Sequence, residues 1–129
     1  MSSPNDKVQL TGYTTTRKFG GYALPVPMQN LLLRGYCEQH NFGYRIPLLE
    51  LYLPDTYMAL HGTIDRCGMS ANIGMCSIYM FPREINTFLA LKEKIDNKKL
   101  QFHFIFERCS VMSDELEEFF YESRLRYLI

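Results

Sequence analysis

The chain has 129 residues, in which 14 lysines and arginines balance 14 aspartates and glutamates, so the formal net charge is zero. A neutral chain has no global field that attracts nucleic acid or an anionic membrane, so we expect any charge-driven binding to be local. The length and the 47% hydrophobic content predict one domain, residues 1–129, whose core needs neither disulfides nor metal.

The four cysteines form no CxxC pair and lie in stretches that read as helix or strand interior, which favours buried free thiols. The opening sequence MSSPNDK lacks the apolar run of a signal peptide, and no stretch approaches about 18 consecutive apolar residues. We therefore expect a cytoplasmic protein with no membrane partner and a flexible segment over residues 1–7.

A strand-like run from Val8 to Thr16 ends in the polar loop GYTTTRKFGG, which continues to Pro25 and Pro27. Prolines are suited to the first turn of a helix, so we expect a helix to begin here. Apolar spacing at i, i+3, i+4, i+7 and i+8 predicts its core-facing stripe. The stripe consists of Met28, Leu31, Leu32, Gly35 and Tyr36.

A second strand is predicted over residues 44–51, followed by a short helix that ends near Gly68. That helix is marked by Tyr57, Leu60, Ile64 and Cys67. The run IGMCSIYMF, residues 73–81, is almost continuously apolar, which is typical of a central parallel strand covered on both faces. Pro82 closes this strand.

A third helix is spaced by Ile85, Phe88, Leu89 and Ile95. In the following run QFHFIFE, residues 101–107, phenylalanines alternate with polar side chains, which predicts an edge strand with one wetter face. The final helix, over residues 112–129, has Ser113 as its N-cap and acidic residues in its first turn.

Strands that alternate with helices predict right-handed crossovers and a single α/β domain. We expect a Rossmann-like three-layer architecture with a four-stranded, mainly parallel sheet, resolvase-like or flavodoxin-like. The open sheet edge and the apolar end Tyr127-Leu128-Ile129 also predict a homo-oligomer, for which a dimer is the commonest choice.

In open parallel sheets, ligands bind beyond the carboxyl ends of the strands. Hydroxyl and guanidinium groups follow the predicted strands there, and Gly20 and Gly21 let backbone amides approach a ligand. A phosphate or carboxylate would suit these donors. The candidate binding residues are Thr15, Thr16, Arg17, Ser77 and Arg83, and the candidate proton-transfer residues are Glu50 and Glu107.

Each of these residues also has a structural interpretation. Threonines at a strand end can satisfy backbone groups, and Gly20-Gly21 can simply shape a turn. Arg83 can be a surface side chain, and Glu107 can pair with Arg108 or Arg17. The loop is neither a Walker motif nor a GxGxxG fingerprint, the histidines lack HxH or HExxH spacing, and no stripe of basic and aromatic residues is present. The sequence therefore predicts no cofactor, no metal and no nucleic-acid partner.

Five segments between about Gly12 and Val111 give the chain a recognisable pattern. They are GYTTTRKF, PVPMQNLLLRGYC, the Glu50 segment through TYMAL, CSIYMFP and LQFHFIFE. In their order and spacing they resemble the sporadic carbohydrate cluster family, small proteins encoded among genes for bacterial surface polysaccharides. The resemblance implies a role in lipopolysaccharide or capsule sugar metabolism and adds Gln29 and Arg34 to the candidate substrate-binding residues.

Tyr13, the hydroxyl-rich loop and the helix near Gln29 also look like the catalytic domain of serine recombinases, more distantly. That family's Tyr-x-Arg-x-Ser pattern would need arginine at Thr15 and the nucleophilic serine at Arg17. Without that serine, and without a DNA-binding domain after Ile129, the resemblance implies the architecture alone.

Two functions remain open from the sequence. One is an enzyme acting on a phosphorylated or nucleotide-linked sugar, in which Arg17 and Arg83 clamp the anion and Glu50 or Glu107 transfers a proton. The other is a non-catalytic accessory or ligand sensor that docks on another carbohydrate-pathway enzyme. Nine tyrosines and nine phenylalanines in a small chain favour this second function.

Overall fold

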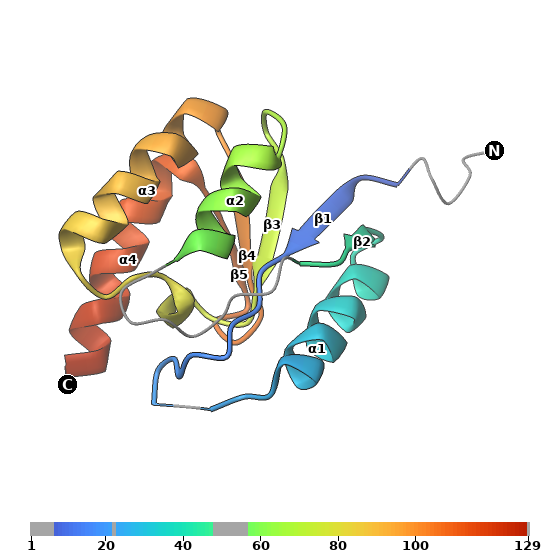
Figure 1. Ribbon diagram of the computed structural model, residues 1–129, viewed down its shortest axis with the longest axis horizontal. Coiled ribbons are helices and arrows are strands. Elements are labelled where there is room, and N and C mark those ends of the chain that lie inside the picture. The colour runs from blue at the N-terminus through green and yellow to red at the C-terminus, as the bar shows by residue number, and fades with distance from the viewer. Residues whose placement is uncertain (1–6, 22, 48–56, 129) are drawn as a thin grey trace.

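The computed structural model describes residues 7–21, 23–47 and 57–128, which form an α/β fold (Figure 1). The α/β class predicted from the sequence is thereby confirmed. In chain order the elements are β1 (Gln9–Gly12), α1 (Val26–Gln39), β2 (Gly43–Arg45), α2 (Met58–Arg66), β3 (Asn72–Met75), the 3-10 helix η2 (Ile78–Met80), α3 (Ile85–Lys98), β4 (Gln101–Phe104), β5 (Cys109–Met112) and α4 (Ser113–Leu128).

The strands form one five-stranded sheet in the order β2-β1-β3-β4-β5. The first four run parallel, and β5 pairs antiparallel with β4. The expectation of four strands is therefore wrong by one, because Cys109–Met112 continues the sheet instead of forming a loop. β4 is consequently flanked on both sides and is not the edge strand that its alternating phenylalanines predicted.

The order of the strands in the sheet changes direction at β1. Helix α1 leads from β1 to β2 on one side, and α2 leads back past β1 to β3 on the other. Right-handed crossovers then place these helices on opposite faces of the sheet. Figure 1 shows α1 on one face and α2, α3 and α4 on the other. The connections diverge beyond the carboxyl ends of β1 and β3, which is where open sheets bind ligands.

Aromatic packing fills the face covered by α3 and α4. Phe88 and Phe120 stack with their ring centroids 3.8 Å apart, and both are buried. Phe81 meets the ring of Phe102 edge-on at 5.3 Å, and Phe104 lies on the same face of β4 as Phe102 because strand side chains alternate. Such aromatic pairs contribute about 0.5–1.5 kcal/mol each beyond their buried area.

Helix α1 is turned about one residue from the predicted stripe. Its buried residues are Gln29, Leu33 and Cys37, whereas Met28 and Leu31 are 46% and 63% exposed. The reason is that the Gln29 side chain is hydrogen-bonded beneath the helix, so the polar residue takes the inward position that the apolar pattern assigned to its neighbours. The predicted stripe is wrong in phase although the helix itself is confirmed.

The third predicted strand also ends earlier than expected. β3 stops at Met75, and the chain turns at Ser77 into η2. The Ser77 hydroxyl accepts a hydrogen bond from the Tyr79 amide at 3.2 Å, which is a side-chain cap that competes with the strand ladder. Of the predicted strand over residues 44–51, residues 44–45 belong to β2, residues 46–47 are not in a strand, and residues 48–51 lie outside the described residues.

The three other α-helices lie close to their predicted positions, and each buries residues that the apolar spacing indicated. Buried positions shared by pattern and structure include Leu60 and Ile64 in α2, Phe88 in α3 and Leu116 in α4. Within the described residues, no helix combines the length and the apolar character that crossing a membrane requires.

His103 on β4 is buried beneath α1, although its polar position predicted a wetter face. Tyr36 hydroxyl lies 2.7 Å from its Nδ1, and Asn72 Oδ1 lies 2.9 Å from its Nε2. This pattern suits a neutral ring that accepts from Tyr36 and donates to Asn72. Burial, with a smaller contribution from nearby His40, lowers the pKa of His103 from 6.5 to about 4.

His103 should make stability fall as the solution is acidified from pH 6.5 to 4. In that interval the unfolded chain binds a proton at this residue and the folded chain does not, so the free energy of unfolding drops by up to roughly 3 kcal/mol. Urea denaturation across this pH range should show the loss in the wild type and a smaller loss in His103→Gln. If the free energy of unfolding changed equally with pH in the wild type and in His103→Gln, the lowered pKa of His103 would not be the cause.

Candidate functional site

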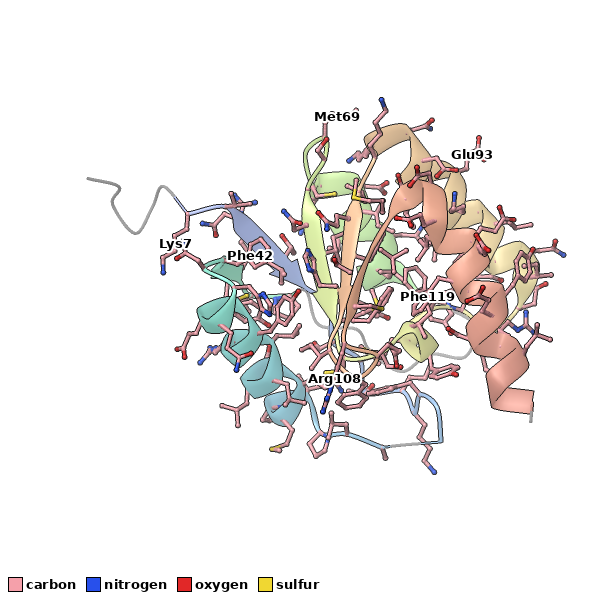
Figure 2. All side chains as sticks on the ribbon, turned by 180° about the vertical axis from the view of Figure 1, so that it is seen from behind. Lys7, Phe42, Met69, Glu93, Arg108 and Phe119 are labelled. Atoms are coloured by element: carbon pink, nitrogen blue, oxygen red, sulfur yellow. The ribbon has the colours of Figure 1, made fainter. Side chains whose placement is uncertain are left out.

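The candidate site lies at the carboxyl ends of β1 and β3. The β1–β3 pairing continues past β1, since the Tyr13 amide donates to Gly74 oxygen at 2.8 Å. Beyond β4, the amides of Ile105 and Phe106 donate to Met75 and Cys76 oxygens at 3.2 and 2.8 Å. Figure 2 shows Arg108 at this end of the sheet and Met69 at the opposite end. Three loops are thereby held side by side.

Buried Gln29 holds the loop that follows β1. Its Oε1 accepts from the Thr15 amide at 3.1 Å, and its Nε2 donates to Thr15 oxygen and Leu24 oxygen, both at 2.8 Å. Within the loop, the Arg17 amide donates to the Thr15 hydroxyl at 3.0 Å. One side chain therefore fixes both ends of the segment between Thr15 and Leu24.

The middle of this loop packs against Tyr79. Gly20 has φ +57°, and a Cβ built on it would lie 3.2 Å from Tyr79 Cδ2, so glycine suits both the backbone conformation and the contact. The Tyr79 hydroxyl donates to Ser123 oxygen at 2.8 Å. Helix α4 thus fixes the ring against which Gly20 rests.

A cavity of about 320 Å³ lies beside Gly20 and Tyr79, which both line it. Four basic side chains line it, and the described residues of its lining include no aspartate or glutamate. The basic residues are Arg17, Lys18, Arg83 and Arg124. Hydroxyl-bearing residues add to them, namely Thr15, Tyr57, Tyr79 and Ser123. We call this the basic cavity.

Aromatic rings support two of the arginines in the basic cavity. The Arg17 guanidinium lies 4.0 Å from the centroid of the Tyr57 ring, and that of Arg124 lies 5.5 Å from Phe120. Stacking of this kind orients the guanidinium plane while leaving its edge able to donate hydrogen bonds. The cavity therefore combines positive charge with flat apolar walls.

A second cavity of about 470 Å³ shares Phe19, Gly20 and Tyr79 with the first, and we call these three residues the shared wall. Its polar lining comes from Ser77 and Glu107. We call it the acidic cavity. The rest of its lining is apolar apart from the shared wall and consists of Ala23, Leu24 and Phe106.

The Glu107 carboxylate is held by the turn after β3. Its Oε2 accepts from the Ser77 hydroxyl at 2.9 Å and its Oε1 accepts from the Ile78 amide at 2.7 Å. Burial raises the pKa of Glu107 from its ordinary value, and these two hydrogen bonds oppose the rise without cancelling it. Burial first, and then the charge of Glu107, raise the pKa of Cys76 to about 12, so this neighbouring thiol is not a thiolate nucleophile near neutral pH.

The predicted site residues divide among several places. Arg17, Thr15 and Arg83 line the basic cavity, whereas Ser77 and Glu107 line the acidic cavity. The remaining predicted residues line neither cavity or cannot be placed. Thr16 is exposed, Arg34 is exposed on α1, Gln29 is buried behind the loop, and Glu50 lies outside the described residues.

Gln29 was expected to bind substrate, but its amide is occupied by the loop it supports. Conversely, the sequence reasoning missed Lys18, Tyr57, Phe106 and Arg124 as lining residues. Lys18 follows Arg17 directly and was the easiest to find. Arg124 lies near the end of the final helix, where a basic residue matches the helix dipole, and no sequence signal placed it beside the cavity.

The described residues contain no group of three or more His, Cys, Asp or Glu side chains that could hold a metal ion. The donors at the site are cationic and hydroxylic, which suits an anionic ligand. Comparisons with protein-family models, with curated proteins and with solved structures found no match to this chain.

Gln29→Leu should destabilise the protein by about 2–4 kcal/mol, because it leaves the Thr15 amide and two carbonyl oxygens without their partner. Gln39→Leu, at the exposed end of the same helix, is the matched control and should change the free energy of unfolding by no more than about 0.5 kcal/mol. Urea denaturation measures both. Equal stability of the two variants would show that the loop does not depend on Gln29.

Proposed function

We propose that the protein binds the phosphate of a phosphorylated or nucleotide-linked sugar in the basic cavity. The observation that carries the proposal is that Arg17, Lys18, Arg83 and Arg124 surround one cavity where the sheet connections diverge. Cavities of about 300–1,000 Å³ with apolar walls and a few convergent polar groups are typical of small-molecule sites.

The chemistry of the lining favours phosphate over a simple carboxylate. A guanidinium donates two parallel hydrogen bonds to phosphate oxygens, and several cations can share the charge of one phosphate. Lys18 adds a compact charge on a flexible stem, and Thr15 belongs to the same loop. The rings of Tyr57 and Phe120 offer apolar surface beside the charge, which suits an organic phosphate.

The carbohydrate part of the proposal rests on the resemblance to the sporadic carbohydrate cluster family. The segments that carry this resemblance supply much of the lining of both cavities: GYTTTRKF contributes Arg17, CSIYMFP contributes Tyr79, and LQFHFIFE contributes Glu107. A role in surface-polysaccharide sugar biosynthesis is consistent with a site made from these segments.

The Rossmann-like assignment is likewise part of the proposal. The order β2-β1-β3-β4-β5 is that of flavodoxin-like doubly wound sheets, whose ligand lies at the β1/β3 switch point. The antiparallel β5 departs from an all-parallel sheet. The cavities nevertheless lie at the predicted switch point, since loops after β1 and β3 line both of them.

An acid–base role for Glu107 remains a prediction. Its raised pKa suits proton transfer near neutral pH better than that of an exposed carboxylate does. If the protein is an enzyme, Glu107→Gln should abolish turnover of a sugar phosphate while the phosphate group is still bound in the basic cavity. Detection of product by mass spectrometry in wild type and in Glu107→Gln tests this, and equal turnover in both chains would remove Glu107 from the reaction.

A non-catalytic accessory subunit is the second candidate function. The observation that favours it is the apolar surface of α1, where Met28 and Leu31 are largely exposed. Met28 and Leu31 are three residues apart and so lie on one face of α1, and contiguous exposed apolar surface marks protein contacts where it is large. Ligand binding without turnover would favour this function over the enzyme.

Arg17→Gln and Arg83→Gln should each weaken binding of glucose 1-phosphate about 10- to 100-fold, because each removes charge-assisted hydrogen bonds to phosphate. Isothermal titration calorimetry at low salt measures the change, and the wild-type affinity should fall as salt is added. Arg66→Gln, at the far end of α2, is the matched control and should bind like the wild type.

The outcome that would contradict the proposal is also clear. If inorganic phosphate and glucose 1-phosphate both fail to bind the wild type, or if the arginine variants bind as tightly as Arg66→Gln, the basic cavity is not a phosphate site.

A further inference from the structure

The acidic cavity is a built polar site that phosphate binding leaves unused. It adjoins the basic cavity, because Phe19, Gly20 and Tyr79 line both. Its single described carboxylate would repel a phosphate. The basic cavity therefore suits an anionic group and the acidic cavity suits a neutral group that donates hydrogen bonds. A ligand that occupied both would carry a phosphate at one end and hydrogen-bond donors at the other.

Glu107 retains acceptor capacity toward this cavity. A carboxylate has about four acceptor positions on its two oxygens, and the Ser77 hydroxyl and the Ile78 amide use one position on each oxygen. The Ser77 hydroxyl donates its hydrogen bond to Glu107 and accepts one from the Tyr79 amide. Glu107 is therefore oriented by protein groups and can still accept hydrogen bonds from a ligand.

Apolar side chains line the acidic cavity together with these acceptors. Phe19 and Phe106 have ring centroids 6.2 Å apart, and Leu24 extends the apolar lining. Phe106 is 45% exposed even though it is a large aromatic residue. Apolar surface together with a fixed carboxylate in one cavity matches a sugar ring, which has C–H faces and hydroxyl groups around its rim.

The backbone makes this arrangement rigid. The Phe106 amide donates to Cys76 oxygen, so Phe106 and Glu107 are held beside the turn that contains Ser77. The loop that Gln29 fixes at Thr15 and Leu24 supplies Phe19, Gly20 and Leu24 to the lining. Hydrogen bonds therefore anchor both segments that line the acidic cavity, which limits the reorganisation that ligand binding requires.

We infer that the acidic cavity is the subsite for the sugar ring, in which Glu107 accepts hydrogen bonds from sugar hydroxyls and Phe106 packs against the ring. The inference rests on the proposed phosphate site and specifies the other half of the ligand. It makes Glu107 a determinant of the preference for a sugar phosphate over inorganic phosphate.

The test compares, in each variant, the affinity for inorganic phosphate with the affinities for sugar phosphates. Calorimetry would give the dissociation constants of inorganic phosphate and of three probes: glucose 1-phosphate, mannose 1-phosphate and N-acetylglucosamine 1-phosphate. In the wild type at least one sugar phosphate should bind tighter than inorganic phosphate. In Glu107→Gln that preference should fall about tenfold, because a charge-assisted hydrogen bond is replaced by a neutral one.

Glu107→Gln keeps the size of the side chain and an oxygen that can accept from the Ile78 amide, while exposed Glu93→Gln on α3 is its matched control. Phe106→Ala is a second variant, because Phe106 is partly exposed and its removal does not open the core. It should also reduce the preference, whereas Tyr121→Ala, which removes a similarly exposed aromatic side chain on α4, should not.

The outcomes separate the two proposals. If phosphate binds in an arginine-dependent manner but no sugar phosphate is preferred, or if Glu107→Gln and Phe106→Ala retain the preference, the sugar subsite is wrong and the phosphate site stands. If no probe binds the wild type, or binding does not depend on Arg17 and Arg83, the phosphate site itself fails.

Discussion

The hydrogen bonds of one buried glutamine side chain hold the site together. Gln29 projects from the first turn of α1 and binds the main chain at Thr15 and Leu24. Between these anchors the loop supplies Arg17 to one cavity and Phe19 and Gly20 to both. A glutamine can do this because its amide carries donor and acceptor together, so it pairs with both the N–H and the C=O of one residue, Thr15.

The basic residues and the carboxylate line different cavities. Arginines close to a carboxylate would lower its pKa and make it a weaker base. Here the arginines line the basic cavity and Glu107 lines the acidic cavity, and burial raises the pKa of Glu107. A ligand with an anionic end and a hydroxyl-rich end can therefore meet complementary groups at each end. This division is what links a phosphate site to a sugar site.

The sequence predicted the order of the helices and of most strands, because apolar spacing and proline positions are local signals. It did not reveal β5, since four residues with no clear alternation acquire a strand conformation only by pairing with β4. It also placed α1 out of phase, because a buried Gln29 cannot be recognised from hydrophobicity. Side-chain hydrogen bonds to loop backbone, made by Ser77 and Gln29, determine where β3 ends and which face of α1 is buried.

The candidate site was predictable in part. Strand ends at a switch point indicated Arg17, Ser77 and Glu107, because topology alone gathers such loops. The sequence did not indicate that these residues divide between two cavities that share Gly20 and Tyr79. The packing of Gly20 on Tyr79 depends on a positive φ and on a hydrogen bond from Tyr79 to α4, both of which arise from tertiary structure.

The most direct test of the account is a titration of ¹⁵N-labelled protein with glucose 1-phosphate, followed by the amide resonances. Saturable shifts should be confined to the loop around Lys18 and Gly20, the turn around Tyr79, and the residues next to Glu107, and they should be absent from the exposed face of α1. Shifts that do not saturate, or that cluster on α1 while the loop around Gly20 stays unchanged, would contradict a phosphate-binding site at this end of the sheet.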